Sequence, residues 1–379
     1  MKWMQLEQKK SMKWIAGIVL AAIFVVVLYQ LQPTAKPQLV NTNGRTFEEG
    51  RVVEVLEDNL QEDGSRIGDQ KIRLQMESGN FAGEVLEATS ANGFLFGAVC
   101  QSGTKVIAIV SQAGSTRSIT VYSLNRSLPV YAFIAFFFLM LGLIGGKKGV
   151  KSALALLFTL LCLWKMFLPL IFRGVSPVWA AIFTAFLTVT VSLSLIGGCN
   201  KKTLAAVFGS FFGLFVAGAS ALLFGYCAGL SGYNVSNIEA LLFVGQNTKI
   251  DIGGLLFAGV LISTLGAVMD IAMDIAAAIA EIHAHSPELC RRKLFASGMN
   301  VGRDIMGTMA TTLILAFTGS SLGVLVLNYV YDLPYLQVIN SNTMNIEIMQ
   351  GLAGSFGVVF TVPLVSAIAA FLLATKQEA

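Results

Sequence analysis

The chain has 379 residues, of which 55% are hydrophobic and only 13% are charged, whereas an ordinary soluble domain carries about 25% charged residues. Its mean hydropathy is +0.71, and several apolar runs approach the ~20 residues that cross a bilayer, which excludes a wholly soluble protein. The net charge of +4 is not gathered into a basic stripe interleaved with aromatic residues, so we expect no nucleic-acid partner.

The first apolar run, residues 15–31, follows a basic N-terminal segment and has the pattern of a signal peptide. No A-x-A-like cleavage site follows this run, and the next residues form a polar linker that contains Pro33 and Pro37. We therefore predict that residues 1–40 comprise a basic cytoplasmic tail, an uncleaved signal-anchor helix and a linker, with cleavage as the alternative.

Residues 41–126 have the character of a small β domain. Short runs alternate apolar and polar residues, and turn pairs such as Asp63-Gly64 and Asn92-Gly93 separate them. The predicted strands are Val52–Leu56, Gln70–Met76, Glu84–Ala88, Lys105–Val110 and Ser118–Leu124. Five short strands predict a small all-β barrel, for which an OB-like fold is one candidate. The domain has no histidine and no acidic cluster with catalytic spacing, so we interpret it as a binding or docking module.

Residues 127–379 predict a transmembrane domain of seven helices, which together with the anchor makes about eight. The predicted spans are residues 128–145, 152–171, 177–197, 203–229, 253–281, 302–330 and 352–374. Glycines recur at helical spacing in these spans and predict close helix packing. They include Gly209 and Gly213, Gly254 and Gly259, Gly302 and Gly307, Gly319 and Gly323, and Gly351, Gly354 and Gly357.

The lysines and arginines of the short loops give the orientation, because cytoplasmic loops are rich in both. With the N-terminus inside, the short outer loops hold only Arg173 and Lys249. The inner loops hold Lys147, Lys148, Lys151, Lys201, Lys202, Arg291, Arg292 and Lys293, and Lys376 follows the last span. We therefore predict a plasma-membrane protein with both termini in the cytoplasm and residues 41–126 outside.

Two aspartates, Asp270 and Asp274, lie inside the predicted span 253–281. Asp270 is about three residues past the middle of this span, roughly 5 Å from the bilayer midplane. Asp274 lies one turn further in on the same helix face, and Glu281 continues this stripe towards the cytoplasm. A carboxylate at the bilayer centre costs at least ~3 kcal/mol, and such groups usually serve an ion, a proton or a partner charge. The two aspartates are therefore candidate proton- or cation-binding residues, with Glu281 as an inner extension.

Arg303, in the next predicted span, is the candidate partner charge. Residues 286–288, Ser-Pro-Glu, predict the N-cap and first two positions of a new helix. Folding the two helices back about residue 286 brings Arg303 level with residue 269, whereas a turn at residue 288 brings it level with residue 273 or 274. Arg303 then reaches the aspartate face if the rotation of its helix allows.

Asp304 is about 100° around the helix from Arg303 and faces elsewhere. The alternative interpretation of these charges is a structural clamp, in which one aspartate–arginine pair pins two helices together. Two aspartates one turn apart, with Asp304 and Glu281 in addition, exceed what a clamp needs. We therefore favour a functional site.

His283 and His285 are the only histidines. Their spacing at a helix end directs the two rings to different sides, and no zinc-site spacing is met, so we predict no metal site and no cofactor. The sequence contains no nucleophile elbow, P-loop, dinucleotide fingerprint or HExxH motif, so we expect no enzymatic activity. A membrane-embedded enzyme would have only the Asp270/Asp274 or His283/His285 pairs to use.

The chain resembles the YibE/F-like family of bacterial multipass membrane proteins, in its longer form with an N-terminal anchor and a β domain. The residues that carry the resemblance are Gly266-Ala-Val-Met-Asp270, Gly298-Met-Asn-Val-Gly-Arg-Asp-Ile-Met-Gly-Thr308 and Thr311-Thr-Leu-Ile-Leu-Ala316. The resemblance extends over the whole chain and is sharpest over residues 245–320. It implies a multipass membrane protein of bacterial type and supplies no activity.

The leading hypothesis is a secondary transporter or exporter in which Asp270 and Asp274 bind a proton or cation and Arg303 tunes them. Rocking of the glycine-rich helices gives alternating access, and the β domain contacts substrate or an outside protein. The alternative is a non-transporting scaffold or assembly factor, whose β domain binds cell-envelope or membrane proteins. The partners expected are the lipid bilayer, a proton or cation, and either an extracytoplasmic protein or a second copy of the chain.

Overall fold

The computed structural model describes residues 37–374, apart from residues 41, 62–66, 92–96, 114–115 and 236. The predicted anchor helix with its lysines, the turns at 63–64 and 92–93, and Lys376 lie outside the described residues. The chain forms two compact units, one from Gln38 to Met140 and one that takes in the chain from Leu141 onward.

The first unit contains a closed β-barrel with the strand order β1-β2-β3-β5-β4. Neighbouring strands are antiparallel except β3 and β5, which pair in parallel. The strands are β1 (Arg45–Glu57), β2 (Gln70–Met76), β3 (Val85–Ser90), β4 (Lys105–Ala113) and β5 (Thr116–Leu124). The five predicted strands are thus confirmed, with β2 at its predicted bounds. β1 begins at Arg45 rather than Val52 because it pairs with β4 along residues 45–51 and with β2 from Gly50 onward.

Alternation of side chains along the strands builds the barrel core. In β2, Ile72, Leu74 and Met76 point inward and are buried, while the residues between them are exposed. Gln70 is also inward and only 2% exposed. Its amide nitrogen donates to the Asp58 carboxylate and to the Cys100 carbonyl oxygen (3.2 Å), and its amide oxygen accepts from the Cys100 backbone N–H (2.8 Å). This buried amide is therefore satisfied and ties β2 to the segment before β4.

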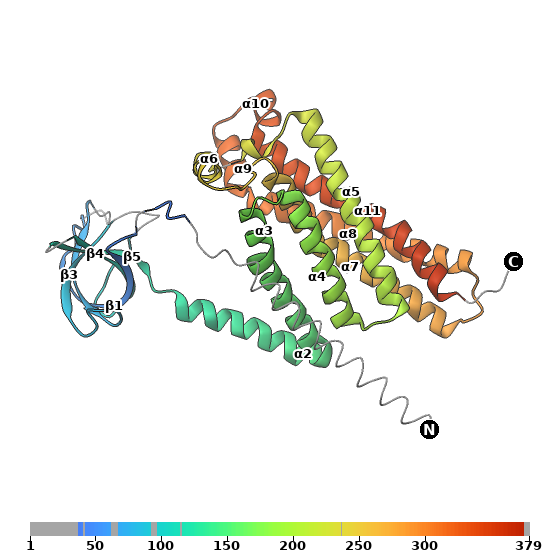
Figure 1. The fold of residues 1–379 in the computed structure, drawn as a ribbon, viewed down its shortest axis with the longest axis horizontal. Coiled ribbons are helices and arrows are strands. Elements are labelled where there is room, and N and C mark those ends of the chain that lie inside the picture. Colours follow the sequence, from blue (N-terminus) through green and yellow to red (C-terminus); the bar gives the residue numbers. More distant parts are fainter. Residues whose placement is uncertain are drawn as a thin grey trace, which may run out of the picture. The chain divides into compact units, whose positions relative to one another are not determined.

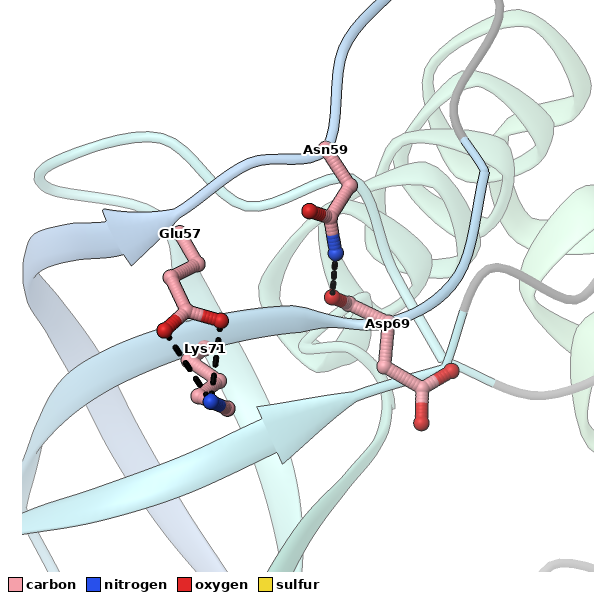
Figure 2. Close-up of polar contacts among 4 residues, drawn as sticks. All are labelled: Glu57, Asn59, Asp69 and Lys71. Carbon is pink, nitrogen blue, oxygen red and sulfur yellow. Dashed lines mark hydrogen bonds and ion pairs between the residues drawn. The ribbon is translucent and has the colours of Figure 1, made fainter.

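Polar contacts close the β1–β2 connection at its base (Figure 2). Asn59, at a positive φ of 47°, donates its side-chain amide to the Asp69 carbonyl oxygen at 2.8 Å. The Lys71 ammonium lies 2.9 Å from one carboxylate oxygen of Glu57 and 3.0 Å from the other. These contacts join the end of β1 to the start of β2.

The first unit ends inside a long apolar helix, α2 (Ser127–Cys162). Gly146 interrupts this helix with a non-helical backbone (φ 53°, ψ −135°), a left-handed conformation that glycine adopts without strain. The predicted spans 128–145 and 152–171 lie on the two sides of this break. A π-helical turn (Leu163–Phe167) and α3 (Leu168–Phe172) complete the second segment.

The rest of the second unit is a helical bundle, in which α6, α9 and α10 gather at one end (Figure 1). Its helices are α4 (Pro177–Gly197), α5 (Lys201–Ala228), α6 (Ile238–Asn247), α7 (Leu255–His285), α8 (Arg291–Ser320), α9 (Leu322–Val330), α10 (Tyr335–Ile339) and α11 (Asn342–Leu373). Local sequence sets several ends. Pro177 occupies the first turn of α4, and the Asn200 side chain caps α5 by accepting from the Thr203 N–H.

Five of the described helical segments are long and apolar enough to cross a membrane, and a sixth is counted if the bent pair α8 and α9 is one span. The five are Ser127–Phe172, α4, α5, α7 and α11. α4 matches its predicted bounds. The total of eight spans stays a prediction, because the anchor lies outside the described residues and Ser127–Phe172 counts as one segment.

The predicted span 302–330 is not one straight helix, because the chain bends by 64° between α8 and α9, and the two count as a span only as a bent pair. Gly319, Ser320 and Ser321 meet at the bend, and glycine and serine are weak formers of helix interiors. The Ser320 hydroxyl donates to the Phe317 carbonyl oxygen at 2.7 Å, and the Ser321 N–H donates to the same oxygen at 3.2 Å. α8 therefore ends here. α11 in turn begins at Asn342, ahead of the predicted 352, because the Ser341 side chain caps it.

The bundle core is formed where α5, α7, α8 and α11 pack together. Small residues allow the close approach, as predicted for Gly213, Gly302, Gly354 and Gly357, whose Cβ positions would clash with neighbouring helices. The prediction is wrong for Gly259, Gly307, Gly319 and Gly323, which have open space beside them.

Four buried hydroxyls of the bundle bond to their own helices. Thr184 donates to the Ala180 carbonyl oxygen (2.7 Å), Ser210 to Ala206 (2.8 Å), Thr264 to Val260 (2.9 Å) and Thr361 to Gly357 (2.7 Å). Each hydroxyl is thus satisfied one turn back along its own helix.

Candidate functional site

The face of α7 that carries Asp270 and Asp274 lies outside the bundle core. α7 packs against α4, α5, α8 and α11, and its buried side includes Val268, Ile271 and Ile275. Asp270 and Asp274, one turn apart, are exposed. The apolar side of α7 packs against the four neighbouring helices, so the two carboxylates lie on the exposed side among the described helices.

Small and polar residues continue this exposed face along α7. Gly259, Ser263 and Gly266 precede the aspartates at helical spacing and are exposed, as is Glu281 after them. A Cβ placed on Gly259 or Gly266 would meet nothing within 4 Å. The face is thus a strip of low side-chain bulk that leads to two carboxylates.

The register between α7 and α8 places Arg303 level with Asp274. A Cβ on Gly302 would lie 3.2 Å from Ile275 Cδ1, and one on Gly298 would lie 2.5 Å from Ile279 Cδ1. The two helices run antiparallel, so the residue after Gly302 is level with the residue before Ile275. This register is the one predicted for a turn at residue 288.

Arg303 does not form an ion pair with either aspartate. Among the described residues, no nitrogen of Arg303 lies within 4.0 Å of a carboxylate oxygen of Asp270 or Asp274. Arg303 and Asp304 are both exposed on α8. Arg303 therefore lies level with Asp274 as predicted, but its side chain forms no ion pair with either aspartate in the described structure.

The turn between α7 and α8 differs from its prediction. Ser286 ends α7, with its N–H donating to the Ile282 carbonyl oxygen at 3.0 Å, and the N-cap of α8 is Cys290. The predicted helix start at Ser286 is wrong, because one more turn, in which the Leu289 N–H donates to the Ser286 carbonyl oxygen, separates the helices.

The turn between α7 and α8 contains two notable electrostatic contacts. The backbone N–H of Lys293 lowers the pKa of the exposed Cys290 thiol, as a helix N-terminus does for a thiolate. His285 Nδ1 lies 3.7 Å from a Glu281 carboxylate oxygen. Among the described residues, no three His, Cys, Asp or Glu side chains lie close enough together to hold a metal ion.

Sequence reasoning missed Glu347. This residue lies in the second turn of α11, beside the α8–α9 bend, and lines a cavity of about 220 Å³. One of its carboxylate oxygens is buried without a hydrogen-bond partner. The signal for it was Ser341, a favoured N-cap residue whose position extends the last helix upstream to include Glu347.

A larger cavity, about 450 Å³, lies among α4, α5 and α7. Its lining includes Trp179, Phe211 and Phe215 and contains no charged or hydroxyl-bearing side chain. It offers contact area but no group that could bind a charged ligand.

Comparison with known proteins gives a family and no closer relative. No curated protein sequence matches the chain, and no solved structure matches it. The model of the YibE/F-like protein family matches residues 133–375, which is more than half of the chain. This matched region contains all the helices from α3 to α11, together with both carboxylate sites described above. The chain therefore belongs to the family of YibE/F-like proteins.

Proposed function

We propose that this protein is a multipass plasma-membrane protein with eight spans, and that it is a secondary transporter or exporter. Both termini lie in the cytoplasm, and the β-barrel lies outside. The basic residues of the inner loops support this orientation, and the five or six span-length helices support the membrane setting. The strand order of the barrel and its parallel β3–β5 pair support an OB-like assignment.

The observation that carries the transport proposal is that Asp270 and Asp274 lie in a long apolar helix without a fixed positive partner. A carboxylate in this setting is costly unless something neutralises or solvates it. A structural clamp would pair an aspartate with an arginine, but Arg303 forms no such pair in the described structure. A proton or a cation that comes and goes then fits these carboxylates better than a permanent pair does.

The packing of the bundle supports movement around this site. Glycines bring α5, α7 and α11 into close contact, and the hydroxyls of Ser210, Thr264 and Thr361 keep their hydrogen bonds within their own helices. Helices packed in this way can rock against each other, which is what alternating access requires.

The second candidate function is a scaffold or assembly factor, and one feature of the barrel favours it. Phe47 and Tyr122 lie side by side on the barrel surface with ring centroids 5.3 Å apart, 60% and 39% exposed respectively. Exposed aromatic pairs are common anchors of protein–protein contacts. If the protein is a scaffold, it should bind a partner protein through the barrel and transport nothing across the membrane.

Reaction of the purified protein in lipid with a hydrophobic carbodiimide tests the proposal, because the reagent modifies protonated carboxyls in apolar surroundings. Adducts are located by mass spectrometry across roughly pH 6 to 9. We expect labelling of Asp270 or Asp274 that one ion of a panel suppresses, and loss of each adduct in Asp270→Asn and Asp274→Asn.

Glu288, exposed in the turn after α7, serves as the control carboxylate and should stay unlabelled. Absence of labelling at both aspartates at every pH would show permanent ionisation and would favour the scaffold.

A further inference from the structure

The bend between α8 and α9 builds a cavity against the start of α11. Residues of α8, α9 and α11 line it together, and the chain bends by 64° between α8 and α9. Ser321, at the bend, is only 7% exposed. The cavity has a volume of about 220 Å³.

The lining is mostly apolar with a single charged group. The apolar side chains come from α8, α9 and α11, and they are Ile314, Phe317, Leu325, Met344, Ile348 and Leu352. The polar side chains are Thr318, Ser321 and Glu347, and no lysine, arginine or histidine lines the cavity. The only formal charge that the cavity presents is negative.

Glu347 is the group that lacks a partner. Its Oε2 atom is buried and has no hydrogen-bond partner. A buried carboxylate oxygen in apolar surroundings is unfavourable unless a donor or a cation meets it. Glu347 also lines the cavity, so a cation bound there would lie next to this carboxylate.

The chemistry of the lining selects the kind of cation. Ca²⁺ takes about six to eight oxygen ligands, whereas the lining side chains supply one carboxylate and two hydroxyls, one of which, Thr318, already donates to the Ile314 carbonyl oxygen at 2.8 Å. Apolar walls with one fixed charge instead suit a ligand with an apolar body and one positive group. Phe317 adds an aromatic ring to the lining, and aromatic rings attract cations.

We propose that the cavity at the α8–α9 bend binds a monovalent organic ammonium ion with an apolar body, held by the carboxylate of Glu347. Taken with the proposed transport function, on which this step rests, that class of cation is the substrate. The binding itself requires no transport, and it uses a carboxylate separate from Asp270 and Asp274.

Equilibrium dialysis of the full chain in lipid nanodiscs with labelled benzyltrimethylammonium tests the proposal. We expect saturable binding, and little competition from neopentylbenzene, the neutral molecule of the same shape. Glu347→Gln keeps the size of the side chain and removes its charge, so binding should weaken on the order of 10- to 100-fold. Glu288→Gln, a matched change at an exposed carboxylate, should leave binding unchanged.

Gly351→Ala is the second variant, directed at the shape of the cavity. Its new methyl carbon would lie 3.8 Å from atoms of Ile314 and Phe317, an ordinary contact distance, so the fold should tolerate it. The methyl group takes up room in the cavity, and we expect weaker binding at an unchanged unfolding temperature.

Equal binding of the neutral molecule, with no effect of Glu347→Gln, would overturn the proposal and show an apolar cavity that takes lipid. Asp270→Asn and Asp274→Asn should leave the dialysis result unchanged. Binding that persists in a protein whose aspartates show no carbodiimide adducts would remove the transport function and leave this site in place.

Discussion

Arg303 lies level with Asp274 on the neighbouring antiparallel helix, and yet no hydrogen bond or ion pair joins the two side chains in the described part of the chain. Axial position and rotation are separate properties of a helix. The turn at residues 286–290 sets the first, and the packing of Gly298 and Gly302 against α7 and α11 sets the second. Both glycines face the core, which turns the Arg303 side chain outward.

The first prediction concerns the energy of coupling between Arg303 and Asp274. Without direct contact, Arg303→Gln and Asp274→Asn should change the free energy of unfolding additively, within about 0.5 kcal/mol. A double-mutant cycle measured by denaturant unfolding in lipid or detergent checks this. Asp270→Asn with Asp274→Asn is the control pair, because like charges one turn apart should couple. A coupling of ~1 kcal/mol or more between Arg303 and Asp274 would instead show a closed ion pair.

The second prediction compares two glycines of α8. Gly302→Ala should destabilise the protein by about 1–3 kcal/mol, because its methyl group would overlap the Val362 side chain. Gly307→Ala has open space and should change stability by less than about 0.5 kcal/mol. Unfolding of the two variants under one condition checks this. Equal destabilisation by both would mean that something outside the described residues, such as a second copy of the chain, covers the Gly307 side of α8.

The third prediction uses native cysteines to test the orientation. Cys227, at the end of α5, and Cys199 and Cys290, at inner loops, are exposed, whereas Cys100 and Cys162 are buried. In intact cells a membrane-impermeant maleimide should label Cys227 alone. Permeabilisation should add Cys199 and Cys290. Labelling of Cys290 from outside would reverse the proposed topology.

The fourth prediction is a pH dependence at Cys290. Its pKa lies below the ordinary thiol value because the Lys293 backbone N–H stabilises the thiolate. Alkylation by an uncharged maleimide follows the thiolate fraction, so its rate should rise at a lower pH in the folded protein than in the unfolded chain.

Two substitutions at Lys293 separate the backbone effect from the charge. Lys293→Pro removes the N–H in the first turn of α8, where proline is tolerated, and it should return the alkylation profile towards the unfolded one. Lys293→Gln keeps the N–H and should move the profile less. The reverse order would assign the shift to the lysine charge.

The pattern of apolar residues was sufficient to predict the bounds of elements whose ends carry local sequence signals. Pro177 and the glycines after residue 196 bound α4, and alternation from Gln70 to Met76 bounds β2, so both match. The bend at Ser321 escaped prediction because residues 322–330 are as apolar as a continuing span. Hydropathy depends only on composition, so it does not show where the backbone bends.

The sequence predicted the position of Arg303 along its helix but not the side of the helix on which its side chain lies. Counting 1.5 Å per residue from the turn places Arg303 opposite Asp274, but the side of α8 that faces α7 depends on which residues pack best. Glu347 was missed for a related reason. Its helix starts at the Ser341 cap, whereas the apolar run that marks a span starts later.

The hydroxyls that bond back along their own helices have a mechanical consequence. When α5 shifts against α11, the bonds of Ser210 and Thr361 move with their own helices and stay intact. Resistance to such a shift then comes from the fit of side chains into the spaces beside glycines, which is a matter of volume. The relative position of these helices should accordingly respond to hydrostatic pressure and to lateral pressure in the lipid, the two variables that act on volume and area.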